Sequence, residues 1–424
     1  MESDTFLILL GGLLVLAFLA EEAFSRLRIP PVLVLIACGL VLGPGLKLLP
    51  PGRFAQVAPH FGAVAFLLIL FEGGLDLDLH VVLGRWRAGL FLAVTSFATA
   101  LVAVVLVGTA FAMPLKQALV LGVVLAPISG AIVIPLAGKL GLQEEVRTLM
   151  VLEAALADVL GVLGIVLTGK LITGGGLAGL LALGSLLAAL FSVLLAVTVG
   201  LAWPRLLRRL GDRRFVDVLT FGVALALYGI VELPGASGAL AVLVFGLTLA
   251  NEDHLLELLN MRVEPVGSVT RHAVHRLHGF IGELTFLVRA FFFVFLGVVV
   301  RFANLSGRSY AQALAIFVLF LAARWLALRV LKPGPLNAVS RADRRTLLLV
   351  QPRGLVTAVL AIEAAHLGLD PDGTFLGQAS LLILATNLLL IIGARRLRKP
   401  LPAVPGQRNL SAASPAPGGV PGRL

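Results

Sequence analysis

Long apolar runs separated by short polar segments recur along the whole chain. Most runs hold about 18 or more residues, which is enough for a helix to cross the hydrocarbon core of a bilayer. The pattern predicts an all-α polytopic membrane protein with about thirteen transmembrane helices. The predicted spans are residues 5–24, 31–49, 57–76, 88–112, 117–138, 147–169, 177–202, 216–232, 235–251, 279–300, 309–328, 346–367 and 376–394.

Composition supports this class and excludes a nucleic-acid-binding protein. The 424 residues are 59% hydrophobic and only 13% charged, against about 25% charged in soluble domains. The net charge of +11 is spread over short connections. Segments assigned to the inside hold 25 of the 34 Lys and Arg residues and outside segments hold 6. This positive-inside bias predicts a cell (inner) membrane protein with its N-terminus outside and its C-terminus cytoplasmic.

The ends and the longest connection differ from the rest of the chain. Residues 1–397 are predicted to form one transmembrane domain, whereas the Pro-, Gly- and Ser-rich segment 398–424 is predicted to be a disordered cytoplasmic tail. The connection 252–278 is partly amphipathic and is expected at the membrane surface. It carries His272, His275 and His278, which are either pH-sensing groups or ordinary solvated side chains.

The fifth and twelfth predicted spans each contain helix-breaking residues at mid-membrane. Pro127 and Gly130 interrupt "LGVVLAPISGAIVIPLAG", and Pro352 and Gly354 interrupt "LLLVQPRGLVTAVLAIEAA". Proline removes a backbone donor and clashes with the preceding turn. Irregular backbone at this depth is tolerated only when it is buried in protein or lines a cavity. Two broken helices at matching positions indicate inverted repeats around a transporter site, although two ordinary proline kinks are the simpler alternative.

Charged residues inside spans are expensive and usually functional. Glu283, Arg324 and Glu363 lie near predicted span ends and are expected to reach the interface, whereas Arg289 is equally consistent with ion pairing.

Glu153, Asp158 and Arg353 lie deeper and need partners. The two acids are five residues apart, or roughly 140° around a helix, so they do not form one paired acid site. Arg353 is the expected partner for one of them. Glu72 of the third span is a further candidate, with packing near the cytoplasmic end as its alternative.

Several motifs, in order, resemble those of the monovalent cation:proton antiporter-1 family, the NhaP-like sodium/proton antiporters. The resemblance covers nearly all of residues 1–397. The segments that carry it are "RIPPVLVLIACGLVLGP" (28–44), "ILFEGGLDLDL" (69–79), "LEAALADVLG" (152–161), "AFFFVFLG" (290–297) and "PRGLVTAVLA" (352–361).

This resemblance implies that Asp158 binds either a cation or a proton, with alternating access turning competition into exchange. Ser129 and, through water, Glu72 are expected to contribute oxygen ligands, so an alkali cation at Asp158 is the predicted metal and no cofactor is required. Glu153 and Arg353 are expected to form a structural ion pair. A single acid in the Ala157–Asp158 pair implies electroneutral exchange.

The resemblance has gaps and leaves alternatives. Many members carry Thr-Asp-Pro where this chain has Ile128, Ser129 and Gly130, and Ala154 and Ala157 replace the family's Ser and Asn. The sequence therefore leaves Na⁺ and K⁺ open as the ion exchanged for H⁺. A channel is less favoured because no filter motif is present. No span carries His-Glu-x-x-His, so no enzymatic activity is predicted. Membrane lipids surround the chain, and a homodimer is a family expectation.

Overall fold

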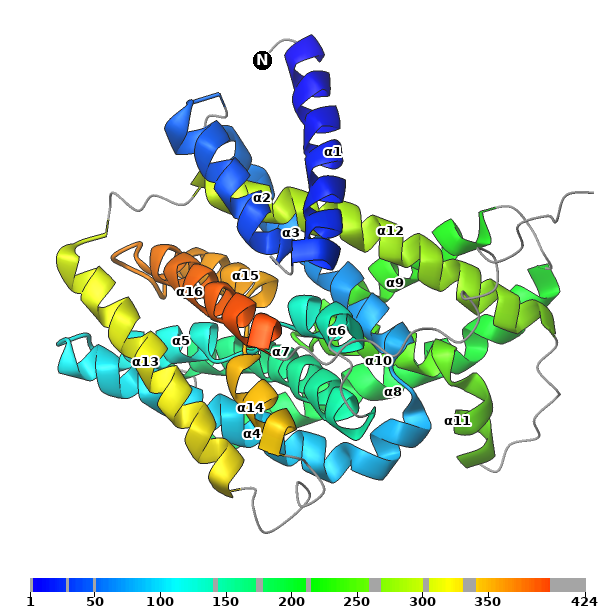
Figure 1. The fold of residues 1–424 in the computed structure, drawn as a ribbon. Coiled ribbons are helices and arrows are strands. Elements are labelled where there is room, and N and C mark those ends of the chain that lie inside the picture. The colour runs from blue at the N-terminus through cyan, green and yellow to red at the C-terminus, as the bar shows by residue number, and fades with distance from the viewer. Residues whose placement is uncertain are drawn as a thin grey trace, which may run out of the picture.

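The computed structural model describes residues 3–27, 30–48, 51–139, 144–172, 178–210, 215–258, 268–299, 305–330 and 341–396. Within these residues the chain forms sixteen α-helices, one π-helix and no strand (Figure 1), which confirms the all-α prediction. In the first half lie α1 (Ser3–Leu27), α2 (Pro31–Leu40), the π-helix η1 (Val41–Gly45), α3 (Pro51–Asp76), α4 (Leu79–Ala110), α5 (Leu115–Leu125), α6 (Gly130–Lys139), α7 (Glu144–Ile172) and α8 (Ala178–Leu210). In the second half lie α9 (Val216–Glu232), α10 (Gly238–Ala250), α11 (Glu252–Leu258), α12 (Ser268–Val299), α13 (Gly307–Val330), α14 (Arg341–Leu349), α15 (Leu355–His366) and α16 (Phe375–Arg396).

Each of the thirteen predicted segments coincides with one helix or with two consecutive helices. Three segments are divided: α2 and η1, α5 and α6, and α14 and α15. Among the described residues, six helices are long and apolar enough to cross a membrane unbroken, or seven if the bent pair α10 and α11 counts as one span. The count of thirteen is thus supported in part, because divided and shorter helices do not meet this criterion.

Glycine residues allow the helices of the interior to approach closely. A Cβ at Gly39 of α2 would lie 2.8 Å from the Gly297 Cα of α12, and a Cβ at Gly246 of α10 would lie 2.6 Å from the Phe71 carbonyl oxygen of α3. Small residues at such crossings let two backbones touch, which is how helices associate in lipid. The first contact joins α2 to α12, and the second joins α10 to α3, the helix that carries Glu72.

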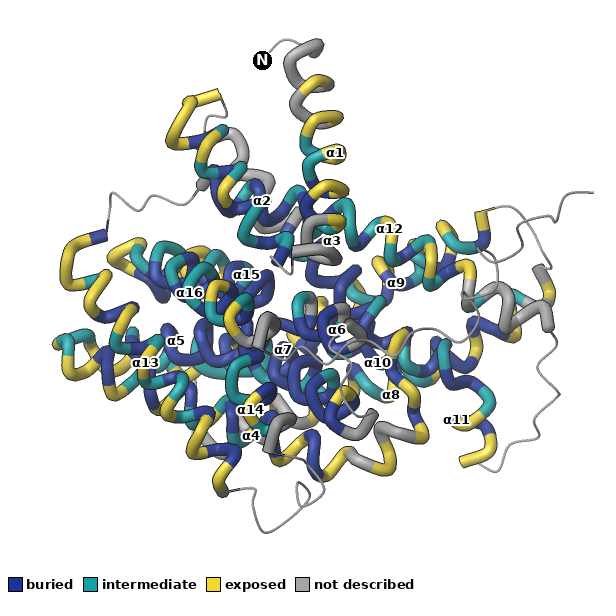
Figure 2. The backbone as a smooth tube through the Cα atoms, viewed as in Figure 1, coloured by how far each residue is buried: buried dark blue, intermediate teal, exposed yellow. Residues whose placement is uncertain are grey.

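Burial is concentrated in the middle of the molecule. Figure 2 shows buried segments along α5, α7 and α10, whereas α1 and α13 at the periphery carry many exposed residues. Every residue from Leu121 to Gly130 is buried. Large apolar side chains such as Leu106, Leu194 and Leu314 are exposed on α4, α8 and α13. Such a surface suits contact with lipid.

The connection predicted at the membrane surface is largely helical. Its first residues form α11, which is bent by 91° from α10, and its last residues form the beginning of α12. The backbones of His272, His275 and His278 therefore lie in a helix and not in a loop. Residues 259–267 and the predicted tail 398–424 lie outside the described residues.

Candidate functional site

Two interrupted helices cross each other inside the molecule. The breaks lie between α5 and α6 and between α14 and α15, at the proline and glycine residues expected from the sequence. The backbone N–H of Ser129 donates to the Pro352 carbonyl oxygen over 2.9 Å, so the two breaks are joined directly. A Cβ at Gly354 would collide with Ser129 Oγ. The close approach of the two unwound segments therefore requires glycine at position 354.

Asp158 of α7 faces this crossing. The residue is only 1% exposed, and its Oδ2 accepts a hydrogen bond of 3.1 Å from the backbone N–H of Gly130. Gly130 is the first residue of α6, so the carboxylate lies at a helix N-terminus, where the backbone dipoles favour negative charge. Asp158 Oδ1 has no hydrogen-bond partner among the described residues. One carboxylate oxygen is thus positioned by the protein, and the other has no polar neighbour that binds it in the described structure.

Two hydroxyl groups near the breaks are also buried without a hydrogen-bond partner in the described part of the chain. They are Ser129 Oγ and Thr357 Oγ1, and both residues are 1% exposed. Ser129 was a predicted ligand, whereas Thr357 was not identified from the sequence. The signal that was available is its position one turn after Gly354, in a helix with few other polar groups.

Arg353 lies in the α14–α15 break and is 2% exposed. Its backbone is held by α16, because its N–H donates to Thr386 Oγ1 over 3.0 Å and its carbonyl accepts from Asn387 Nδ2 over 2.9 Å. The guanidinium carbon lies 4.5 Å from the centroid of the Phe320 ring. Nε and Nη1 have no hydrogen-bond partner among the described residues. The cation is therefore close to the crossing without being neutralised by a direct ion pair in the described structure.

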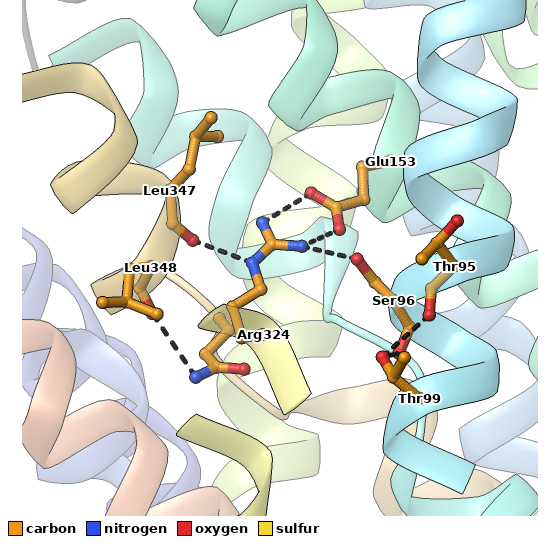
Figure 3. Close-up of polar contacts among 8 residues, drawn as sticks. Thr95, Ser96, Thr99, Glu153, Arg324, Leu347 and Leu348 are labelled. Atoms are coloured by element: carbon orange, nitrogen blue, oxygen red, sulfur yellow. Dashed lines mark hydrogen bonds and ion pairs between the residues drawn. The ribbon is translucent and has the colours of Figure 1, made fainter. Parts of the chain in front are cut away.

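The prediction that Glu153 forms its ion pair with Arg353 was wrong. Glu153 of α7 is instead held by Arg324 of α13, through Nη1 to Oε1 and through Nη2 to Oε2 at 2.7 Å. Arg324 also donates from Nη1 to Ser96 Oγ of α4 over 2.7 Å and from Nε to the Leu347 carbonyl of α14 over 2.9 Å (Figure 3). One buried guanidinium thus joins four helices around the first half of the second break.

Arg324 was expected to extend to the interface, and this prediction was wrong. The residue is 3% exposed because a carboxylate, a hydroxyl and a carbonyl oxygen surround its guanidinium. A fork of N–H donors that matches a carboxylate in two places is suited to such a buried pair. Glu283 and Glu363, in contrast, are exposed as predicted.

Glu72 is placed against α12. It is half-buried, its Oε1 lies 3.5 Å from where a Cβ at Gly282 would be, and its charged neighbours include Arg289, Asp76 and His278. His278 Nε2 lies 2.7 Å from Asp76 Oδ1, one turn beyond Glu72. Glu72 therefore belongs to a group of charges between α3 and α12.

A cavity of about 200 Å³ begins within one turn of Asp158. Its lining includes Val162 of α7, Leu360 of α15 and Tyr228 of α9. Two carboxylates, Glu232 and Glu363, also line the cavity. The negative lining gives this space a favourable potential for cations on one side of the crossing.

A buried carboxylate beside two crossed, unwound helices in an apolar all-helical chain is the arrangement of a secondary active transporter. The chain matches the family model described as "Sodium/hydrogen exchanger, transmembrane" over residues 12–394. It therefore belongs to the sodium/hydrogen exchanger family, and it is a multi-pass membrane protein for which family and fold support cation/proton antiport.

Solved structures with the same fold include the sodium proton antiporter MjNhaP1 from Methanocaldococcus jannaschii. The structure of that protein at pH 8 matches with a TM-score of 0.76 and 21% identity, over 92% of this chain and 100% of that one. A second structure of MjNhaP1, from an electron-microscopy map, matches with a TM-score of 0.75 and 21% identity, over 94% and 97% of the two chains.

Proposed function

We propose that the chain exchanges Na⁺ for H⁺ at Asp158, one ion for one proton, by alternating access. The observation that carries the proposal is the free Oδ1 of a fully buried carboxylate at the crossing of the two breaks. A carboxylate oxygen binds a proton or a cation through the same lone pairs, so the two compete for this oxygen. Only one of them occupies the site at a time.

The hydrogen bonds around Asp158 indicate which elements would move together during alternating access. Asp158 is held by α6, and the α5–α6 break is joined to the α14–α15 break through Ser129 and Pro352. These elements share direct hydrogen bonds and are expected to move as one body. Motion of this body against the helices around it would expose the carboxylate first to one side and then to the other. The cavity lined by Glu232 and Glu363 is the proposed route on the side expected to be outside.

Electroneutral exchange is proposed because the site presents one free carboxylate. Residue 157 is a buried alanine and supplies no second acid. Glu153 is neutralised by Arg324 and is assigned a structural role. Arg353 keeps the crossing positively charged when Asp158 is protonated, and this charge opposes entry of a cation until the proton has left. A measured membrane potential generated by exchange in sealed vesicles would contradict the one-for-one ratio.

Asp158→Asn tests the assignment of the site. Asparagine keeps the oxygen that faces Gly130 but carries no charge and binds no exchangeable proton. In proteoliposomes with an internal pH indicator, the wild-type protein should collapse a pH gradient when Na⁺ is added, and the variant should not. Cation-dependent proton flux in Asp158→Asn at the wild-type rate would overturn the proposal. Equal elution profiles of the two proteins in size-exclusion chromatography control for folding.

K⁺/H⁺ exchange is the second candidate, since the buried Ala154 and Ala157 remove oxygens that many relatives have. The same vesicles with Na⁺, Li⁺ and K⁺ at equal concentrations decide between the two. A channel predicts cation flux without any proton gradient.

Glu72 is kept as a proposed ligand through water, and Glu72→Gln should then raise the half-saturating Na⁺ concentration without abolishing exchange.

The remaining proposals concern the setting of the transporter. We place it in the cell (inner) membrane with the N-terminus outside and the C-terminus cytoplasmic, from the Lys and Arg distribution. Spans 1–6 and 8–13 are proposed as inverted repeats, each with one interrupted helix, and the protein is proposed to be a homodimer. Cysteine labelling at each terminus and mass measurement in detergent test these assignments.

A further inference from the structure

We propose that Thr357 donates its hydroxyl oxygen as a ligand to the cation held by Asp158, and that this ligand favours Na⁺ and Li⁺ over K⁺. The inference rests on the proposed function and deepens it, because it names a third member of the same site. Neither the motifs nor the family resemblance assigned a role to this residue.

Thr357 is the third residue of α15. Gly354 immediately precedes α15 and touches the side chain of Ser129, since a Cβ there would collide with Ser129 Oγ. Thr357 follows Gly354 by three residues. Residues three apart lie one above the other on one face of a helix. Thr357 therefore lies on the face of α15 that meets the α5–α6 break.

α15 packs against α7. The beginning of α15 lies at Ser129, and Ser129 adjoins Gly130, which bonds Asp158 of α7. Further along both helices, a Cβ at Gly161 of α7 would lie 2.9 Å from Leu360 Cδ1 of α15. The two helices thus advance in the same direction. Asp158 and Thr357 each precede this contact by three residues, a rise of about 4.5 Å, so they lie at the same level.

The Thr357 hydroxyl lacks the hydrogen bond that a threonine in a helix usually makes. Buried threonines in helices usually donate to the carbonyl four residues earlier, as Thr248 does to Val244 over 2.7 Å. For Thr357 that carbonyl belongs to Arg353, which lies in the break and accepts from Asn387. Thr357 Oγ1 has no partner among the described residues. The lone pairs of this buried hydroxyl oxygen are therefore available to coordinate a cation.

Three unbonded oxygens therefore gather from three elements: Asp158 Oδ1, Ser129 Oγ and Thr357 Oγ1. Hard cations are bound by several such oxygens, and hydroxyl and carbonyl oxygens serve beside a carboxylate. Ala154, one turn before Asp158 on α7, is fully buried and offers no oxygen. The third side-chain ligand must then come from another helix, and α15 supplies it. A smaller ion gains more from each added oxygen because the energy varies inversely with distance.

Thr357→Val tests the ligand, because valine has the shape of threonine without its hydroxyl. The half-saturating Na⁺ and Li⁺ concentrations for exchange should rise at least about tenfold, with a smaller change for K⁺. Thr357→Ala should have the same effect, and Thr357→Ser, which keeps the oxygen, should stay within about twofold of wild type. The matched control is Thr248→Val, which removes a buried hydroxyl that already has a partner in its own helix.

A second readout does not depend on transport. Cations that bind only the folded protein raise its melting temperature, so thermal unfolding in detergent with Li⁺, Na⁺ and K⁺ reports binding directly. Thr357→Val and Thr357→Ala should lose most of the Na⁺- and Li⁺-induced shift, and Thr248→Val should retain it. The proposal for Thr357 is overturned if both variants behave like Thr248→Val in both assays while Asp158→Asn is inactive. Failure of the proposed function would appear differently, as absence of exchange in the wild-type protein.

Discussion

Glu153 is the anion that neutralises the buried Arg324, and its replacement by glutamine is predicted to destabilise the protein strongly. Both side chains are about 2% exposed, so water does not take over the lost interaction. Glutamine keeps the size of the side chain and one oxygen acceptor but removes the charge. The Arg324 guanidinium then keeps its bonds to Ser96 and Leu347 and lies in the interior without a counter-charge.

The size of the effect follows from this geometry. Arg324 donates to both carboxylate oxygens of Glu153, and each hydrogen bond to a charged group contributes about 1.5–3 kcal/mol. Leaving one partner of a buried pair without its counter-charge is destabilising by about 3–5 kcal/mol, and this is the expected size of the effect. A double replacement, Glu153→Leu with Arg324→Met, removes both charges and should recover part of this loss.

The assay is a double-mutant cycle followed by thermal unfolding in detergent. Glu153→Leu and Arg324→Met should each lower the unfolding temperature markedly, and the double variant Glu153→Leu/Arg324→Met should be more stable than the sum of these single effects predicts. Glu153→Gln alone should also lower the unfolding temperature. Arg329→Met is the matched control on the same helix. Its guanidinium stacks on Trp325 at 3.7 Å, and loss of an exposed contact of this kind amounts to about 0.5–1 kcal/mol. Additive single effects, or a Glu153→Gln protein as stable as wild type, would refute the reasoning.

Three further predictions concern the crossing, the helix packing and a loop. Gly354→Ala should abolish exchange and destabilise the protein by about 1–3 kcal/mol, because its Cβ would collide with Ser129 at the crossing; Gly222→Ala, with nothing within 4 Å, should be tolerated in the same exchange assay and melts. Gly297→Ala should lower the melting temperature by separating α12 from α2, where a Cβ would lie 2.8 Å from the Gly39 Cα; an unchanged melt would count against this packing. Burial raises the pKa of Asp370, which accepts the backbone N–H groups of Thr374 and Phe375. The folded protein therefore binds the Asp370 proton more tightly than the unfolded chain, in which the pKa is 3.8. The resulting stability is present below the unfolded pKa and is lost as pH rises through the folded pKa. The stability of wild type relative to Asp370→Asn should thus decline from about pH 4 upward. A difference that stays flat with pH would contradict that sign.

The breaks in the two crossing helices were predictable because proline and glycine act locally. Pro127 and Pro352 lack a backbone N–H donor whatever the tertiary structure, and Gly130 and Gly354 make the adjoining backbone more flexible. Asp158 was predictable for a similar reason, since a lone acid in an apolar span requires an explanation. These signals need no knowledge of which helices are neighbours.

The partner of Glu153 was not predictable in this way. Arg324 and Arg353 are both arginines in apolar spans, and the choice between them depends on how α13 packs against α7. Closeness of Arg324 to a predicted span end suggested exposure, but α4, α7 and α14 surround it in three dimensions. The role of Thr357 was hidden as well, because a threonine in a helix ordinarily bonds its own backbone. Only the folded structure shows that this bond is not made, because Thr357 Oγ1 is buried without a partner among the described residues.

The central claim is that one carboxylate, Asp158, binds either the cation or the proton. The most direct test is the Na⁺ dependence of exchange in proteoliposomes at several values of pH, equal on both sides of the membrane. Competition for one site predicts that the half-saturating Na⁺ concentration rises by up to about tenfold for each unit of pH decrease. A half-saturating concentration independent of pH would show that proton and cation bind at separate sites, and would contradict the account.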